Sequence, residues 1–281
     1  IGQLRLEDCH ADVGLPDMRL EQAREAGART LVVGVANRGG VISDIWMQTL
    51  MEALELGYDI ASGLHHRLNQ TPQLRERAAA LGRQLFDVRY PEQVLSVGNG
   101  EKRPGRRLLT VGTDVSSGKM FTALAIEREM KSRGMAADFR ATGQTGIFIA
   151  GSGIAVDAVV ADFISGAAEW LCPENDADHW DLIEGQGSLF HASYAGVTLG
   201  LIHGSQPDRM VLCHEPGRPH MRGLPGYPLP SLRESIEMNE AAGRLTNPEC
   251  RVSGLSLNTS GVSESDSERL LKAAEDEVGL P

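Results

Sequence analysis

The stretch at residues 108–130, LLTVGTDVSSGKMFTALAIEREM, constrains the fold more than any other part of the sequence. An apolar run leads into a loop bounded by Gly112 and Gly118, and a helical pattern begins at Lys119. Glycines let the backbone approach an anion, successive loop N–H groups can point inward, and the helix start adds its positive dipole end. The stretch therefore predicts a strand, a phosphate-binding loop and a helix, with a plain strand-to-helix turn as the alternative.

The loop has the form G-T-D-x-x-x-G-K, which is one residue longer than the common Walker A spacing. Met120 stands where a nucleotide-hydrolysing loop carries a Ser or Thr hydroxyl for magnesium. We expect Lys119 to face solvent, so that its replacement leaves the fold intact. The predicted cofactor-binding residues are Gly112, Thr113, Asp114, Ser116, Ser117, Gly118, Lys119, Met120 and, as a reader of an adenine edge after a later strand, Asn258.

Strand and helix patterns alternate along the chain, which favours parallel sheets and an α/β fold. Before residue 91 we expect helices at 17–27, 43–56 and 71–81 between apolar strands. The segment 96–107 is rich in Gly, Pro and charge and is predicted to link two domains, at 1–100 and 106–281. The expected strands of the second domain are 107–111, 136–139, 179–183, 209–213 and 251–257. Its expected helices are 118–133, 154–170, 195–202, 231–243 and 264–277.

Composition narrows the classes of function. The chain of 281 residues has a net charge of −11, so it is a poor general binder of nucleic acid or anionic membranes. Its four cysteines are scattered, without a C-x-x-C spacing, which favours reduced thiols in the cytoplasm. The longest apolar stretch, 153–171, carries three carboxylates and is not expected to span a membrane. The sequence starts at Ile1 without methionine, so we expect the N-terminal domain to be truncated.

Two later stretches carry acidic and basic residues at predicted strand ends. Glu184 follows the strand 179–183 and precedes Gly-x-Gly, and the carboxyl end of a parallel strand faces the ligand crevice. An ordinary strand-end glutamate is the alternative. Arg140 ends the strand 136–139 and precedes a glycine-rich turn, FRATGQTG. In the first domain, polar residues at strand ends would face a cleft if the domains pack edge to edge: Asn37, Arg38, His65 and Arg67.

The segment 213–231, CHEPGRPHMRGLPGYPLPS, is a long stretch without a helical or strand pattern. Loops of this length in compact domains are usually functional or disordered. A metal site of Cys213, His214 and Glu215 is disfavoured, because adjacent residues on a strand point to opposite faces. We expect a substrate loop whose cations bind a carboxylate, with a solvated surface loop as the alternative.

Several long motifs resemble the DgcN-like D-amino-acid N-acetyltransferases, formerly a family of unknown function. The stretches are GLPD, GVANRGG, VGTDVSSGKM, FRATGQTGI, VDAVVADFISGAAE, DHWDLIEGQGSLFH, HGSQPD, HEPGRPHMRGLP and LNTS. The phosphate loop, IEGQG and LN also resemble dethiobiotin synthetase, in which such residues hold ATP, magnesium and adenine. The resemblance implies a Rossmann-like N-terminal domain and a P-loop NTPase-like, parallel-sheet C-terminal domain. It also implies acetyl-CoA as co-substrate and D-glutamate as acceptor.

Acetyl transfer to an amine needs a base, oxyanion donors and cations for the substrate carboxylates. The candidate bases are Glu184 first, then His214 and Asp114, and the oxyanion donors are expected among the N–H groups of 185–188. The candidate substrate-binding residues are Arg140, Arg218, His220 and Arg222. Because Met120 lacks a hydroxyl, CoA binding without a metal is favoured. The alternatives are an ATP- and magnesium-dependent ligase or kinase and a non-catalytic nucleotide-binding regulator. We expect a homo-oligomer, either dimer or tetramer.

Overall fold

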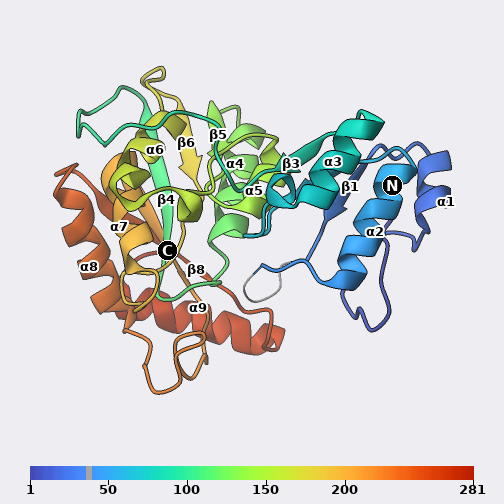
Figure 1. Ribbon diagram of the computed structural model, residues 1–281. Helices are drawn as coiled ribbons and strands as arrows, with labels where there is room; N and C mark the ends of the chain where they lie inside the picture. The colour runs from blue at the N-terminus through green and yellow to red at the C-terminus, as the bar shows by residue number, and fades with distance from the viewer. Residues whose placement is uncertain (36–39) are drawn as a thin grey trace. The chain divides into compact units, whose positions relative to one another are not determined.

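The computed structural model describes residues 1–35 and 40–281, which form two compact units, residues 1–90 and 91–281 (Figure 1). The segment predicted as a linker, 96–107, packs within the second unit. The N–H groups of Asn99 and Gly100 both donate to the Glu169 carboxylate, at 2.9 and 3.0 Å. Arg103 donates to the Cys172 carbonyl at 2.8 Å, so these residues are an ordered part of the second unit.

The first unit is a parallel three-stranded sheet with helices. Its strands, in the order β1-β2-β3, are β1 (Thr30–Val33), β2 (Asp59–Ser62) and β3 (Leu85–Asp87). Its helices are α1 (Leu20–Glu25), α2 (Asp44–Glu55), the short η1 (Leu68–Gln70) and α3 (Pro72–Leu81). The Ser43 hydroxyl caps α2 by accepting from the Trp46 N–H, and Pro72 opens α3, as such residues do at helix starts. Apolar residues of the helices and β2 form its core.

The second unit is a five-stranded parallel sheet in the order β5-β6-β4-β7-β8. Its strands are β4 (Arg106–Gly112), β5 (Ala137–Arg140), β6 (Trp180–Ile183), β7 (Arg209–His214) and β8 (Arg251–Leu257). Each lies where the sequence predicts a strand. Strand β4 is central, and the strand order reverses around it. Open α/β sheets generally bind their ligands outside the carboxyl ends of the strands at such a reversal.

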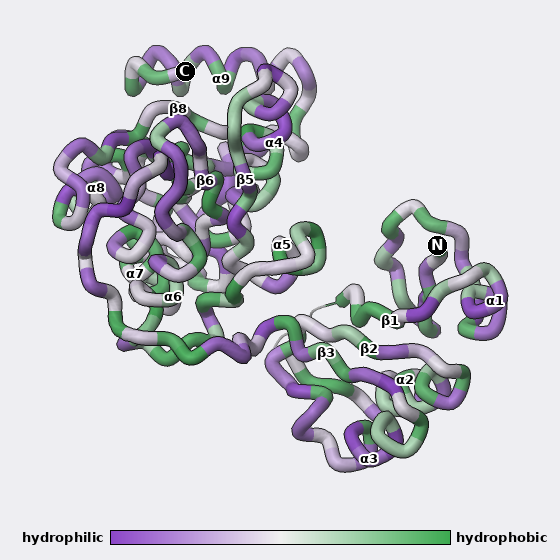
Figure 2. The backbone as a smooth tube through the Cα atoms, turned by 90° about the horizontal axis from the view of Figure 1, so that it is seen from above, coloured by the Kyte–Doolittle hydropathy of each residue, from purple (hydrophilic) through white to green (hydrophobic). Residues whose placement is uncertain are grey.

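Helices cover both faces of this sheet. They are α4 (Lys119–Ser132), α5 (Gln144–Ala150), α6 (Ile164–Leu171), α7 (Ala195–Ser205), α8 (Leu232–Arg244) and α9 (Glu264–Val278), with short turns η2 (Val156–Ala158) and η3 (Ala161–Phe163). Figure 1 shows α4 on one side of the sheet and α7 and α8 on the other. Figure 2 shows the alternation of hydrophilic and hydrophobic residues along α9, which contacts β8 with one face.

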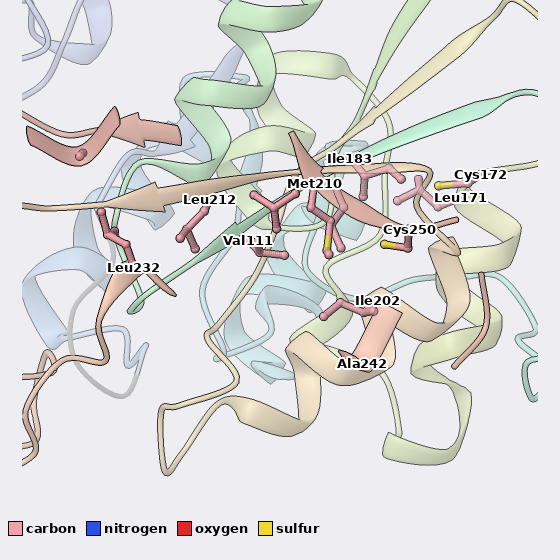
Figure 3. Packing of buried hydrophobic residues seen from close by; sticks show 13 residues of the cluster. Val111, Leu171, Cys172, Ile183, Ile202, Met210, Leu212, Leu232, Ala242 and Cys250 are labelled. Carbon is pink, nitrogen blue, oxygen red and sulfur yellow. The ribbon is translucent and has the colours of Figure 1, made fainter. Parts of the chain in front are cut away.

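The main core of the second unit lies between the sheet and the α7–α8 side. Figure 3 shows Ile202 of α7 and Ala242 of α8 facing Val111 and Met210 of the sheet. All four are at most 9% exposed. Helix α7 also packs closely on α6, because a side chain at Gly204 would lie 2.1 Å from the Ser165 carbonyl oxygen.

Two helices differ from the sequence-based predictions. The predicted helix 154–170 begins only at Ile164, because Ile154 and Val156 donate their N–H groups to the carbonyls of Ala141 and Thr142. These bonds hold 154–156 against the segment after β5 instead of in a helix. Conversely, the glycine-rich stretch after Arg140 contains helix α5, although it was predicted as a turn.

Candidate functional site

The loops that follow β4, β6 and β7 meet at the carboxyl edge of the sheet. Strand β4 lies between β6 and β7, with Leu109 paired to Ile183 and Gly112 to Cys213. The phosphate loop, Glu184 and the long segment after β7 therefore begin side by side. This edge holds most of the candidate site residues.

The phosphate loop has the backbone of an anion-binding turn. Ser116 and Gly118 have φ angles of 52° and 98°, so the chain reverses its curvature twice between β4 and α4. Gly112 has no room for a side chain, because a Cβ there would lie 2.6 Å from the Ser117 hydroxyl and 3.0 Å from the Lys119 Nζ. The loop is therefore closed tightly around the lysine ammonium group.

Lys119 is only 6% exposed, so the prediction that it faces solvent is wrong. It opens α4 from inside the loop, and its Nζ donates to the Asp114 carbonyl at 2.8 Å. Burial lowers its pKa to about 8. Desolvation disfavours the charged form of a lysine, and an anion beside the ammonium group would offset this cost. Met120 follows it, half-buried in the first turn of the helix.

Asp114 is fully buried, and its carboxylate is occupied by donors. One oxygen accepts from the Arg218 guanidinium at 2.5 Å and from the Arg222 N–H at 2.8 Å, and the other accepts from the Val115 N–H at 2.7 Å. Burial alone would raise the pKa of Asp114, but these donors outweigh it and hold the pKa below its ordinary value. The carboxylate is thus charged and tied to the segment after β7.

Glu184 is also a buried carboxylate, but its pKa is raised, whereas the pKa of Asp114 is lowered. It is 4% exposed, and burial raises its pKa although the N–H groups of Thr142 and Gly143 and the side chain of Gln186 favour its charged form. Its Oε2 accepts from these N–H groups at 2.9 and 3.1 Å. Gly146 of α5 leaves space for it, because a Cβ there would lie 2.3 Å from the same oxygen. The unexpected helix α5 is thus part of the wall around Glu184.

The hydroxyl of Ser188 and the ring of His191, which the sequence analysis did not single out, connect the three loops. The Ser188 hydroxyl donates to the Thr113 carbonyl at 3.1 Å. His191 Nε2 lies 3.1 Å from the Arg222 carbonyl and His191 Nδ1 accepts from the Ser193 N–H at 3.2 Å, which defines an imidazole that donates to Arg222. The peptide of Arg222 is therefore held on both sides, since its N–H donates to Asp114. The signal for these residues is the stretch that follows IEGQG, SLFHAS, which places a hydroxyl and an imidazole three residues apart.

The predicted arginines differ in how they are engaged. Arg140 donates from Nε to Asp181 at 2.8 Å, near the start of β6, and Arg218 is 10% exposed and bonded to the phosphate loop. Arg222 has an exposed side chain, and in the described parts of the chain no hydrogen bond or ion pair involves its guanidinium. His220 is half-buried, with Nδ1 3.0 Å from the Met221 carbonyl.

The remaining predicted residues lie at the ends of β7 and β8. His214 Nδ1 lies 2.9 Å from the Thr113 hydroxyl, and burial followed by the charge of Arg218 lowers its pKa. Asn258 donates its N–H to the His214 carbonyl, while its side-chain oxygen accepts from Ser260. The amide oxygen predicted to read an adenine edge is thus engaged within its own turn.

Of the polar residues predicted at strand ends of the first unit, the structure describes His65 and Arg67. The Arg67 guanidinium stacks on the Tyr90 ring at 3.6 Å, and the Tyr90 hydroxyl donates to the His65 carbonyl at 2.5 Å. Asn37 and Arg38 lie outside the described residues. Across residues 1–35 and 40–281, no group of three or more His, Cys, Asp and Glu side chains is placed to hold a metal ion. No helix in this part of the chain has the length and apolar character needed to cross a membrane.

A central strand, a closed phosphate loop with a buried lysine and a second, Rossmann-like unit define a two-domain P-loop protein of the α/β class. The chain belongs to the DUF1611 family. Residues 4–91 match its Rossmann-like N-terminal domain and residues 96–281 match its P-loop C-terminal domain, both described as domains of unknown function.

Relatives match the chain over its whole length. A protein from Tritonibacter scottomollicae named D-glutamate N-acetyltransferase is 54% identical over 100% of this chain and 84% of its own length. A protein of the same name from a Pseudoalteromonas species is 48% identical, over 100% of this chain and 85% of its own. The crystal structure of a DUF1611 family protein from Anabaena variabilis superposes with a TM-score of 0.87 at 38% identity, covering 95% of this chain and 79% of the other.

Proposed function

We propose that this protein transfers the acetyl group of acetyl-CoA to the amine of D-glutamate. The name of two relatives, 54% and 48% identical over the full chain, supports the reaction and the acceptor. The observation that carries the choice of donor is the phosphate loop. It encloses Lys119 but continues with Met120, so it offers a grip for phosphate groups without the hydroxyl that positions magnesium for phosphoryl transfer.

In this proposal the loop binds the pyrophosphate of acetyl-CoA. Backbone N–H groups at the start of α4 and the Lys119 ammonium group supply the positive field. The buried lysine is unfavourably solvated, so neutralisation by a phosphate contributes to affinity. The reaction breaks the thioester and forms an amide, and the acetyl group never bonds to the loop. The loop only orients the donor.

Glu184 is the base that the geometry favours. Its raised pKa suits a carboxylate that takes a proton from the substrate ammonium, because the neutral amine is the nucleophile. Asp114 is a weaker candidate, since donors fill its carboxylate and hold its pKa low. His214 is neutral at physiological pH because of its lowered pKa, and it is the second candidate.

Arg222 is the candidate clamp for the acceptor carboxylate, with His220 beside it. Its peptide is fixed by Asp114 and His191, while its guanidinium is exposed. A fixed backbone leaves less main-chain freedom to lose on binding, and guanidinium matches a carboxylate with two parallel bonds. Arg140 is engaged by Asp181 and is a weaker candidate.

The test of the proposal is product formation by the purified protein. We expect acetylation of D-glutamate, detected by mass spectrometry, with slower reaction of L-glutamate and D-alanine. Activity should survive EDTA, and acetyl-CoA should raise the melting temperature. Turnover that needs ATP and magnesium would support the ligase alternative, and binding without turnover would support a nucleotide-binding regulator. Homo-oligomerisation and a cytoplasmic location stay predictions from the sequence.

Glu184→Gln provides the matching test of the base. The amide keeps the size of the side chain but does not take up a proton, so kcat should fall by about 10²–10⁴-fold, as expected for loss of a general base. The affinity for acetyl-CoA should stay within about threefold, because Glu184 does not contribute the charge that holds phosphate. An unchanged kcat would move the role of base to His214.

A further inference from the structure

We infer that Arg218 is a positioning residue that braces the phosphate loop, and that it does not bind the acceptor. The inference rests on the proposed function for the identity of the loop's ligand. Arg218 lies in the segment after β7, more than 100 residues from the loop in sequence, and its side chain is only 10% exposed.

The two terminal nitrogens of Arg218 are occupied. One donates to the Asp114 carboxylate at 2.5 Å and to the Val115 carbonyl at 2.7 Å. The other donates to the Ser116 carbonyl at 3.1 Å and to the Glu215 carboxylate. A guanidinium binds a substrate carboxylate best with two parallel N–H groups. In Arg218 the N–H groups of both terminal nitrogens already donate to other residues of the protein.

The carbonyls that Arg218 binds belong to the turn of the loop. When successive N–H groups point toward an anion, the carbonyls of the same peptides point away and need donors of their own. Arg218 is the donor for both Val115 and Ser116. Ser116 also has a φ of 52°, which is uncommon for a residue with a side chain, so the turn depends on outside contacts.

The charges around Arg218 support a positional role. Its single positive charge faces two carboxylates, those of Asp114 and Glu215, so the cluster adds no net positive charge for phosphate binding. The Asp114 carboxylate also accepts from the Arg222 N–H. The contact between Arg218 and Asp114 therefore connects the phosphate loop to the main chain of Arg222, the proposed acceptor-binding residue. Loss of Arg218 would remove the donor for the two loop carbonyls together with the charge that offsets Asp114 and Glu215.

The test separates the two substrates. Arg218→Ala should raise the Kd for acetyl-CoA by about tenfold to a hundredfold, the scale of lost charge-assisted bonds, while the KM for D-glutamate changes less than about threefold. Arg222→Ala should show the reverse pattern. Arg128→Ala, which removes an exposed arginine on α4, should leave both constants unchanged. Arg218→Lys keeps the charge but not the fork and should fall between wild type and Arg218→Ala.

A double-mutant cycle tests the partnership with Asp114. The double variant Asp114→Asn with Arg218→Ala should weaken acetyl-CoA binding no more than the more harmful single change, because both changes remove the same Arg218–Asp114 interaction. Circular dichroism checks folding, and Arg218→Lys serves if the alanine variant does not fold. A raised KM for D-glutamate with an unchanged Kd for acetyl-CoA would overturn the inference. So would a lower melting temperature with both constants unchanged.

Inorganic pyrophosphate distinguishes failure of this inference from failure of the proposed function. If wild type binds pyrophosphate, and ATP with magnesium, but not acetyl-CoA, the proposed function is wrong. The brace is still supported in that case if Arg218→Ala weakens pyrophosphate binding by tenfold or more, a threshold of about the energy of one ionic hydrogen bond. Equal pyrophosphate affinity in both proteins overturns the brace whatever the donor is.

Discussion

The ammonium group of Lys119, which we propose to bind phosphate, is unfavourable for folding. Burial lowers its pKa to about 8 from an ordinary value of 10.5. Between these two values the unfolded chain binds more protons than the folded chain, so this group makes the folded state more stable as the pH rises. At neutral pH the lysine is mostly charged in both states, and its burial opposes folding.

Lys119→Met should therefore stabilise the protein and weaken the binding of acetyl-CoA. Removal of the buried charge should raise the free energy of unfolding at pH 7 by roughly 1–3 kcal/mol. The Asp114 carbonyl keeps a donor, since the Ser117 hydroxyl lies 3.2 Å from it. The Kd for acetyl-CoA should rise by about tenfold to a hundredfold. Calorimetric titration and denaturant melts measure the two effects, and the gain in stability should shrink toward pH 10. A less stable variant would contradict this account.

The same lysine predicts a pH dependence of donor binding. Above pH 8 the free protein loses the Lys119 proton, so the affinity for acetyl-CoA should fall by about tenfold between pH 8 and pH 9.5. Lys119→Arg keeps its charge over this range and Lys119→Met never carries one, so both should give flat profiles. Titration calorimetry at several pH values makes the comparison. A flat wild-type profile would show that the ammonium group does not hold the phosphate.

At the scale of elements, the contact between α6 and α7 depends on a missing side chain. Gly204→Ala should lower the free energy of unfolding by about 1–3 kcal/mol, because its Cβ would lie 2.1 Å from the Ser165 backbone oxygen. Gly196→Ala is the matched control in the same helix, since its Cβ meets nothing within 4 Å. It should stabilise by about 0.5–1 kcal/mol. Urea unfolding measures the free energy of unfolding of both variants. Equal changes in the two would contradict the close packing of α6 and α7.

The alternation of elements could be predicted from the sequence because each strand of the second unit carries its own apolar run and turn residues. Helices were harder to predict where a hydrogen bond to a residue far away in sequence decides the backbone conformation. The N–H groups of Ile154 and Val156 are taken by Ala141 and Thr142, and no local pattern reveals that pairing. Helix α5 was missed because glycine disfavours helices, yet Gly146 is needed there to make room for Glu184.

The candidate site was predictable where residues come from strand ends. Glu184 and the phosphate loop lie at the carboxyl edge because parallel strands place their ends together. The engagement of Arg218 was not predictable, since its partner Asp114 is 104 residues away in sequence. The roles of the Ser188 hydroxyl and of His191 were missed for the same reason, because their partners, Thr113 and Arg222, lie on other loops.

At the scale of the molecule, each unit has a core of its own. Residues 91–281 contain the phosphate loop, its brace and two apolar clusters. This fragment should fold cooperatively and bind acetyl-CoA within about threefold of the full chain, as expected for a domain that carries its own core. Thermal melts and calorimetric titration of the fragment check both points, with its Lys119→Met variant as control. Loss of binding in a well-folded fragment would show that the donor also needs residues 1–90.

Among the residues that the structure describes, Arg222 is held through its main chain alone: its N–H donates to Asp114 and its carbonyl accepts from His191. Any residue other than proline can make both of these bonds, so the side chain at this position can be exchanged without dismantling the loops around it. Under the proposed function, a mutation here would change the group that meets the acceptor and leave the loop proposed to bind acetyl-CoA in place. If Arg222 does bind the acceptor, a single substitution at this position could change acceptor preference without disturbing the surrounding main chain.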